Sequence, residues 1–115
     1  MPILAQGAVV LAQVADPRGQ NPKVRPALVV SSDPDIKENR PLALVAITST
    51  IIEPLLDNHV DLPWDPTGKA RSGLKKRSAA VCDWLITVEQ GQIERIIGHL
   101  PPTLMVEIIR RLPSP

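Results

Sequence analysis

The sequence is poor in aromatic residues and in cysteine. It has no phenylalanine and no tyrosine, so its aromatics are the two tryptophans, Trp64 and Trp84. Grooves that bind proline-rich peptides are lined by aromatic rings, and this scarcity argues against an SH3-like peptide-binding module. The single cysteine, Cys82, excludes an internal disulfide. Its place in the apolar run AAVCDWL indicates a buried, inert thiol rather than a nucleophile.

Signatures of several enzyme classes are missing. The sequence contains no Walker phosphate loop, no Rossmann glycine pattern, no HExxH and no paired CxxC, which argues against nucleotide-dependent and zinc enzymes. We therefore expect no metal site and no cofactor. The two histidines, His59 and His99, are far apart in the sequence and are interpreted as structural. No apolar run is long enough to span a membrane, and the N-terminal MPILAQG does not resemble a signal peptide. A cytoplasmic protein without membrane contact is expected.

Length and composition favour a single globular domain over residues 1–115. Hydrophobic residues make up 43% of the chain and charged residues 22%, which is ordinary for a protein with a packed core. The formal net charge of +1 does not by itself indicate a nucleic-acid-binding protein. Cations are nevertheless clustered in one segment, at Lys69, Arg71, Lys75, Lys76 and Arg77. Such a basic loop can bind phosphate, or it can be only a solvated connection.

Prolines and β-branched residues restrict the fold class. The 13 prolines are spread along the chain, so long helices are not expected before the C-terminus. Short apolar runs rich in valine, isoleucine and threonine are typical of strands. These runs cover residues 7–14, 26–31, 42–50, 60–62, 78–88 and 93–99. Segments rich in Pro, Gly, Asp and Asn, such as 32–41, are expected to be turns or loops. The pattern predicts a small antiparallel β-barrel.

One α-helix is expected, at the C-terminal end. Apolar residues there repeat with helical spacing and form a single stripe. The stripe consists of Leu104, Met105, Ile108, Ile109 and Leu112. Prolines precede and follow it, which suits the two ends of a short helix. We expect the stripe either to cap the barrel or to pair with another subunit.

Three segments together carry a resemblance to a known family. Residues 7–33 contain GAVVL and then RPALVVSSD, residues 45–50 read VAITST, and residues 73–83 read GLKKRSAAVCD. The last segment leads through IGHL at 97–100 into the terminal helix. In this order and spacing, over roughly residues 6–112, they resemble the MazF/PemK family of toxins from type II toxin–antitoxin systems. RPALVVSSD followed by ITST is the most specific part.

The resemblance implies a mainly β fold, a partly open SH3-like barrel with a C-terminal α-helix, and a homodimer. It also implies a sequence-specific, metal-independent endoribonuclease that cleaves single-stranded RNA, an mRNA interferase. In that family the ribose 2′-hydroxyl attacks the phosphodiester and leaves a cyclic phosphate and a 5′-hydroxyl. The expected protein partner is a cognate antitoxin of the MazE/PemI type, whose acidic tail occupies the RNA groove. Contact with DNA is expected only through the antitoxin complex.

The residues that match the family's active site suit this chemistry. Arg25 matches the catalytic arginine, and a guanidinium can hold two phosphate oxygens while negative charge builds on them. Thr48 matches the active-site threonine, whose hydroxyl can donate to phosphate or orient the nucleophile. Ser49 stands where some members bind RNA, and Asp83 matches a carboxylate that some members use in proton transfer. The RNA backbone is expected to contact Lys69, Arg71, Lys75, Lys76 and Arg77.

Each of these residues also has a plainer interpretation. Arg25 can pair with a carboxylate at a strand end, and Thr48 can simply favour β structure. Asp83 can accept hydrogen bonds from the backbone at a corner of the barrel. Trp84 is interpreted first as a core residue, although an indole ring can also stack on a base.

Two departures from the family bear on catalysis. Many relatives have an acidic residue after the first glycine, where this chain has Ala8. Many also have a glutamate in the loop before the arginine, where residues 19–24 read GQNPKV. Because an amide cannot accept a proton as a carboxylate can, the role of base would pass to Asp83 or be lost. The alternative function is therefore a catalytically degenerate member that acts as an antitoxin-binding co-repressor.

Overall fold

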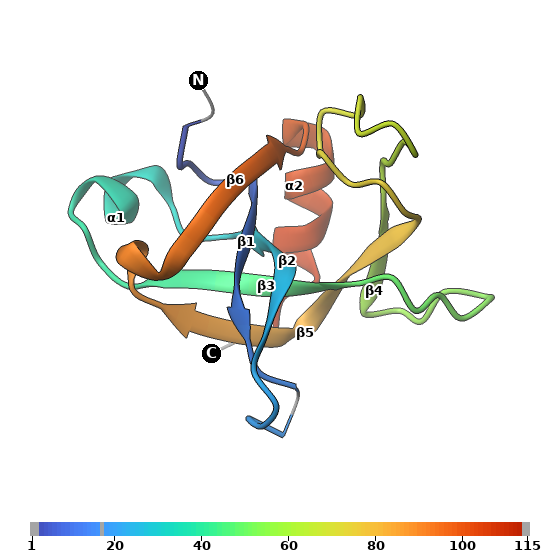
Figure 1. Ribbon diagram of the computed structural model, residues 1–115, viewed down its shortest axis with the longest axis horizontal. Helices are drawn as coiled ribbons and strands as arrows, with labels where there is room; N and C mark the ends of the chain where they lie inside the picture. Colours follow the sequence, from blue (N-terminus) through green and yellow to red (C-terminus); the bar gives the residue numbers. More distant parts are fainter. Residues whose placement is uncertain (1–2, 17, 114–115) are drawn as a thin grey trace.

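Six antiparallel strands form a single sheet in the computed structural model, which describes residues 3–16 and 18–113 (Figure 1). In chain order they are β1 (Ala8–Val14), β2 (Lys23–Val29), β3 (Leu42–Thr48), β4 (His59–Leu62), β5 (Ser78–Val88) and β6 (Ile93–His99). Their order in the sheet is β4-β5-β3-β2-β1-β6. The helical elements are α1 (Asp33–Lys37), the 3₁₀ turn η1 (Gln90–Gln92) and the C-terminal α2 (Pro102–Arg110). The predicted mainly β fold with a C-terminal helix is confirmed.

Two local expectations differ from the structure. The segment 32–41, expected to be a turn or loop, contains α1. Ser32 caps this short helix through its side chain, and Pro34 lies in its first turn, where a missing backbone N–H costs no hydrogen bond. Strand β2 begins at Lys23 rather than at residue 26, because its polar start pairs with the end of β1, where Val14 faces Lys23. Neither feature has an apolar periodicity that would reveal it.

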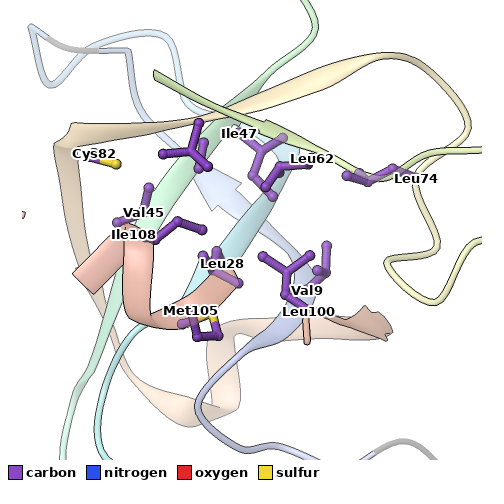
Figure 2. Close-up of a cluster of buried hydrophobic side chains, with 12 residues drawn as sticks. Val9, Leu28, Val45, Ile47, Leu62, Leu74, Cys82, Leu100, Met105 and Ile108 are labelled. Atoms are coloured by element: carbon purple, nitrogen blue, oxygen red, sulfur yellow. The ribbon is translucent and has the colours of Figure 1, made fainter. Parts of the chain in front are cut away.

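Both faces of the sheet are buried, which explains why the strand sequences are nearly continuous apolar runs. One face carries the helix-side core, where Met105 and Ile108 of α2 pack against Leu28 and Val45 (Figure 2). The other face carries the barrel core, which consists of Ala8, Val10, Ala12, Val14, Ala27, Val29, Leu42, Leu44, Ala46 and Val88. Neighbouring residues along β1, β2 and β3 alternate between the two cores, as expected for extended backbone.

The sheet curls into a partly open barrel. Figure 1 shows β1 and β2 running across β3 and β5, which reflects the strong twist of the sheet. Strands β5 and β6 are separated in the sheet by β3, β2 and β1, yet only residues 89–92 connect them in sequence. Val88 of β5 and Ile93 of β6 accordingly meet in the barrel core. The curl thus places the end of β5 close to the start of β6.

Most residues of the predicted apolar stripe of helix α2 pack against the sheet. Met105 and Ile108 are buried in the helix-side core, and Leu104 and Leu112 pack against it. Ile109 is the exception, since 40% of it is exposed. Adjacent residues of a helix point about 100° apart, so Ile108 and Ile109 cannot both face the sheet. No helix in the described part of the chain is long and apolar enough to cross a membrane.

Candidate functional site

A pocket of about 390 Å³ opens between the first residues of β2 and the last residues of β3, beside the connections that flank β4. Its volume is in the range of pockets that hold small ligands. Thr48 and Ser49 lie on one wall, Lys75 and Lys76 on another, and Arg25 comes from β2. Three cations therefore line the pocket, and none of its described lining residues is acidic or a histidine. Such a pocket favours an anion.

Sheet geometry makes Arg25 and Thr48 neighbours. Alternate residues of a strand share a face, so Arg25 lies on the same face as Ala27, and Thr48 on the same face as Ala46. Ala27 and Ala46 are paired across β2 and β3. The two predicted catalytic residues of these strands thus emerge side by side and line one pocket.

The Arg25 guanidinium is held by an aromatic ring. Its central carbon lies 5.7 Å from the centroid of the Trp84 ring, within the range of an attractive cation–π contact. The Nε atom of Arg25 is buried and has no hydrogen-bond partner among the residues that the structure describes. Among the described residues no ion pair involves Arg25. The structure therefore does not show the carboxylate pairing that was the plainer interpretation of this arginine.

The Thr48 hydroxyl is fixed locally while keeping its proton free. Its Oγ1 accepts a hydrogen bond of 3.1 Å from the backbone nitrogen of Thr50. Because that bond uses only an acceptor lone pair, the hydroxyl can still donate to a ligand. Ser49, the next residue, is exposed and also lines the pocket.

The loop that carries Lys75 and Lys76 is ordered by hydrogen bonds within the β4–β5 connection. The buried Ser72 donates from Oγ to the carbonyl oxygen of Pro63 at 2.6 Å and accepts from the backbone nitrogen of Leu74 at 3.2 Å. Asp65 also orders this loop, since its side chain accepts from the Thr67 hydroxyl and from the Lys69 backbone nitrogen. The Thr67 hydrogen bond is the main cause that lowers the pKa of Asp65.

The five predicted RNA-binding cations separate into two groups. Lys75 and Lys76 are exposed and line the pocket, whereas Lys69, Arg71 and Arg77 are not among its lining residues.

Arg77 is instead paired with two carboxylates. It lies 2.5 Å from Glu53 and 3.5 Å from Asp61. The hydrogen bond that it donates to Glu53 is the main cause that raises the pKa of Arg77. Of the predicted phosphate contacts, those of Lys75 and Lys76 are therefore best placed.

Asp83 is not brought together with Arg25 and Thr48. It is exposed on β5, it does not line the pocket, and its Oδ1 accepts a hydrogen bond of 2.6 Å from the side chain of Asn58. The predicted proton-transfer residue thus lies apart from the pocket that holds the other two.

Asp16 orders the β1–β2 loop, which lacks the glutamate of many relatives. Its carboxylate accepts from the backbone nitrogens of Arg18 and Gln20 at 3.0 and 2.9 Å, and from the Asn21 side chain at 3.1 Å. The Gln20 hydrogen bond is the main cause that lowers the pKa of Asp16, and the charge of Arg25 lowers it slightly further. The charge of Arg25 thus affects the pKa of Asp16, a carboxylate of this loop.

Cys82, His59 and His99 are not among the residues that line the pocket. Cys82 is fully buried, as expected, and burial raises the pKa of its thiol. His99 lies with Nε2 2.8 Å from the carbonyl oxygen of Ile3 and so holds the N-terminal segment. His59 lines a smaller pocket beside Arg111. The described residues contain no group of three or more metal-ligating side chains placed to hold an ion.

Sequence reasoning missed the contact between Trp84 and Arg25. Trp84 packs against the barrel core, as expected, but its ring also faces the guanidinium. No linear signal could have shown this, because β2 and β5 are not neighbours in the sheet. Gly73 and Ile97, which also line the pocket, are brought there by the curl of the sheet.

Comparisons with known proteins agree with this architecture. The toxin MazF-mt6 of Mycobacterium tuberculosis has the same fold, with a TM-score of 0.70, 21% identity and coverage of 91% of both chains. An endoribonuclease in complex with its cognate antitoxin from a mycobacterial species gives a TM-score of 0.69 at 18% identity, covering 98% of this chain and 100% of that chain. MazE–MazF from Deinococcus radiodurans gives 0.66 at 17% identity, covering 97% and 93%. At these identities the likeness shows the fold alone.

The family assignment rests on the sequence match. A search of curated proteins finds no match. Residues 5–114, nearly the whole chain, match the family described as PemK-like, MazF-like toxin of type II toxin-antitoxin system. The chain therefore belongs to the PemK-like, MazF-like family of type II toxins.

Proposed function

We propose that this protein is a toxin that cleaves single-stranded RNA at short sequence motifs without a metal ion. The observation that carries the proposal is the pocket in which Arg25 and Thr48 meet Lys75 and Lys76. Three cations, with no acidic residue among the described lining residues, suit a phosphodiester. Solved structures of the same fold include one described as an endoribonuclease, which supports the same chemistry here.

The proposed reaction is an intramolecular displacement at phosphorus. The ribose 2′-oxygen attacks the adjacent phosphorus, the bond from phosphorus to the 5′-oxygen breaks, and a cyclic phosphate and a 5′-hydroxyl result. Arg25 donates to the non-bridging oxygens, on which negative charge increases in the transition state. The Thr48 hydroxyl donates to the same phosphate or orients the 2′-hydroxyl. Lys75, Lys76 and Ser49 hold the flanking RNA.

Proton transfer is the part of the reaction with least support from the pocket. The 2′-hydroxyl must lose a proton and the departing 5′-oxygen must gain one. None of the described lining residues is a carboxylate or a histidine. Asp83 keeps its proposed role on the family resemblance alone, because its carboxylate bonds to Asn58 outside the pocket.

The absence of a carboxylate and of a histidine from the described lining residues favours a second function, which is binding without cleavage. A degenerate member would keep the cationic pocket, occupy it with an acidic antitoxin segment and act as a co-repressor. The antitoxin itself is a proposed partner under both functions, because structures of the same fold are described as complexes with a cognate antitoxin or with MazE. A homodimer is proposed from the family resemblance, and contact with DNA only through the antitoxin complex.

The test is cleavage of a long, mixed-sequence single-stranded RNA by the purified, antitoxin-free protein in excess EDTA, with the ends of the products mapped. The proposal predicts discrete cuts at one shared short motif with 5′-hydroxyl ends. An Asp83→Asn variant assayed over a range of pH separates a proton-transfer role, which changes the pH profile, from a structural one. A folded protein that cuts none of a wide range of RNAs contradicts the enzyme and leaves binding without cleavage as the function.

A further inference from the structure

We infer that Trp84 is a positioning residue that aims the Arg25 guanidinium at the phosphate. This inference deepens the proposed function and rests on it. The Trp84 ring faces Arg25 at 5.7 Å from the guanidinium carbon to the ring centroid. Trp84 is not among the residues that line the pocket, so it acts through Arg25 and not on the RNA.

An interruption in strand pairing puts the indole in this position. Along β3 and β5, Val45 pairs with Leu85 and Ile47 pairs with Ala80. Residues 81–84 of β5 therefore stand against the single residue Ala46, and the strand bends there. The bend carries Trp84 from β5 toward the barrel-core face on which Arg25 lies, although β3 separates β5 from β2.

A ring restrains a guanidinium without using its hydrogen-bond donors. A carboxylate partner would neutralise Arg25 and would have to be displaced before phosphate could bind. An aromatic face attracts the cation and leaves the N–H groups at its edge free. The buried Nε of Arg25 has no hydrogen-bond partner in the described part of the chain, which agrees with a guanidinium held by packing rather than by an acceptor.

Asp16, whose pKa is lowered by the charge of Arg25, is held by hydrogen bonds from other residues. Asp16 accepts hydrogen bonds from Arg18, Gln20 and Asn21 on its two carboxylate oxygens. These bonds keep the carboxylate within its own loop, and none of them comes from Arg25. Restraint of Arg25 is thus left to Trp84.

The kinetics of two Trp84 variants separate the effect of the aromatic ring from the effect of side-chain volume. Trp84→Phe keeps an aromatic face, whereas Trp84→Leu keeps apolar volume alone. We expect Trp84→Leu to lower kcat about 3- to 30-fold on an oligonucleotide containing the mapped cut site, the range set by one cation–π contact. The KM should change much less, and Trp84→Phe should recover most of the loss. Trp64→Leu removes the other tryptophan, which is 43% exposed in a loop, and serves as the matched control.

A nuclear magnetic resonance measurement decides the inference even if no RNA is cut. The Nε–Hε signal of Arg25, assigned by its loss in Arg25→Lys, should be shifted to low proton frequency by the indole ring in the wild-type protein. It should also exchange slowly with water, because Nε is buried. Trp84→Leu should move the signal toward those of exposed arginines, and Trp64→Leu should not.

The outcomes are distinguishable. Absence of cleavage by the wild-type protein contradicts the proposed function, while the Arg25 signal still tests the contact with Trp84. An unshifted Arg25 signal in the wild-type protein overturns the inference, and this result needs no Trp84 variant to fold. Cleavage by Trp84→Leu with wild-type kcat also overturns it. A shifted signal together with a loss of kcat that Trp84→Phe restores supports it.

Discussion

The backbone nitrogen of His99 donates a 2.8 Å hydrogen bond to the carbonyl oxygen of Arg71. This bond ties the loop that carries Lys75 and Lys76 to strand β6. Next to it, Gly98 has no room for a side chain, because an added Cβ would overlap the backbone of Arg71 and Ser72. One wall of the cationic pocket therefore depends on a close backbone approach at β6.

Replacing Gly98 by alanine should displace this loop. The overlap with backbone cannot be relieved by a side-chain rotation, so we expect a loss of about 1–3 kcal/mol in the free energy of unfolding. RNA cleavage should fall as well. An added Cβ at Gly91 would have no atom of the described residues within 4 Å, and Gly91→Ala is the matched control for chemical denaturation and cleavage assays. Equal stability of the two variants would show that the loop is not held by this close approach.

Thr48 should act through its hydroxyl and not through its shape. Thr48→Val keeps the β-branched volume but cannot donate to phosphate, so we expect cleavage to slow about 10-fold or more, the effect of losing a hydrogen bond to a charged group. Thr48→Ser keeps the hydroxyl and should retain most of the rate. Thr87→Val alters an exposed threonine of β5 and controls for strand propensity. A fast Thr48→Val enzyme would remove Thr48 from the reaction.

Lys75 and Lys76 should account for more of the salt dependence of RNA binding than Arg77 does. Replacing both lysines by alanine should reduce the slope of log affinity against log salt concentration by about 1.4, because each phosphate that a cation neutralises on a single strand contributes about 0.7. Arg77→Ala should change the slope less, because Arg77 is already paired with Glu53 and Asp61. Fluorescence anisotropy with an uncleavable 2′-deoxy oligonucleotide measures this. A larger effect of Arg77→Ala would place the RNA elsewhere.

Asp65 should make stability depend on pH in the acidic range. Hydrogen bonds from Thr67 and Lys69 lower its pKa in the folded protein, below the value of about 3.9 in an unfolded chain. Its contribution is therefore present above about pH 3.9 and is lost as the pH falls through the folded pKa. Urea unfolding between pH 6 and pH 2.5 should show a smaller acid loss of stability in Asp65→Asn than in the wild-type protein. If the free energy of unfolding depends on pH equally in both proteins, the Asp65 carboxylate does not contribute to acid-sensitive stability.

Much of the fold could be predicted from the sequence, because burial of both sheet faces leaves continuous apolar runs. Strands β5 and β6 lie where the runs 78–88 and 93–99 placed them. The short helix α1 escaped prediction because a Ser cap and a proline turn look the same in a loop and in a one-turn helix. The polar start of β2 escaped because pairing with β1, not burial, makes it a strand.

The site was only partly predictable. Arg25 and Thr48 followed from their match to the family's motifs, and the register of β2 and β3 explains why they meet. The contact of Trp84 with Arg25 and the separation of Asp83 from the pocket both depend on the bend at residues 81–84. Strand alternation would place Trp84 on the same face as Cys82, and the break in pairing that puts them on different faces has no periodic signal in the sequence.

The role of Arg25 is the most direct test of the whole account. Single-turnover cleavage of RNA in EDTA should slow about 100-fold or more in Arg25→Ala, as for loss of a principal oxyanion donor. Arg25→Lys should recover little, because an ammonium cannot bind two phosphate oxygens in the same fork. Arg95→Ala, at an exposed position of β6, should cleave at the wild-type rate. Cleavage by folded Arg25→Ala as fast as by the wild-type protein would contradict a pocket that works through this guanidinium.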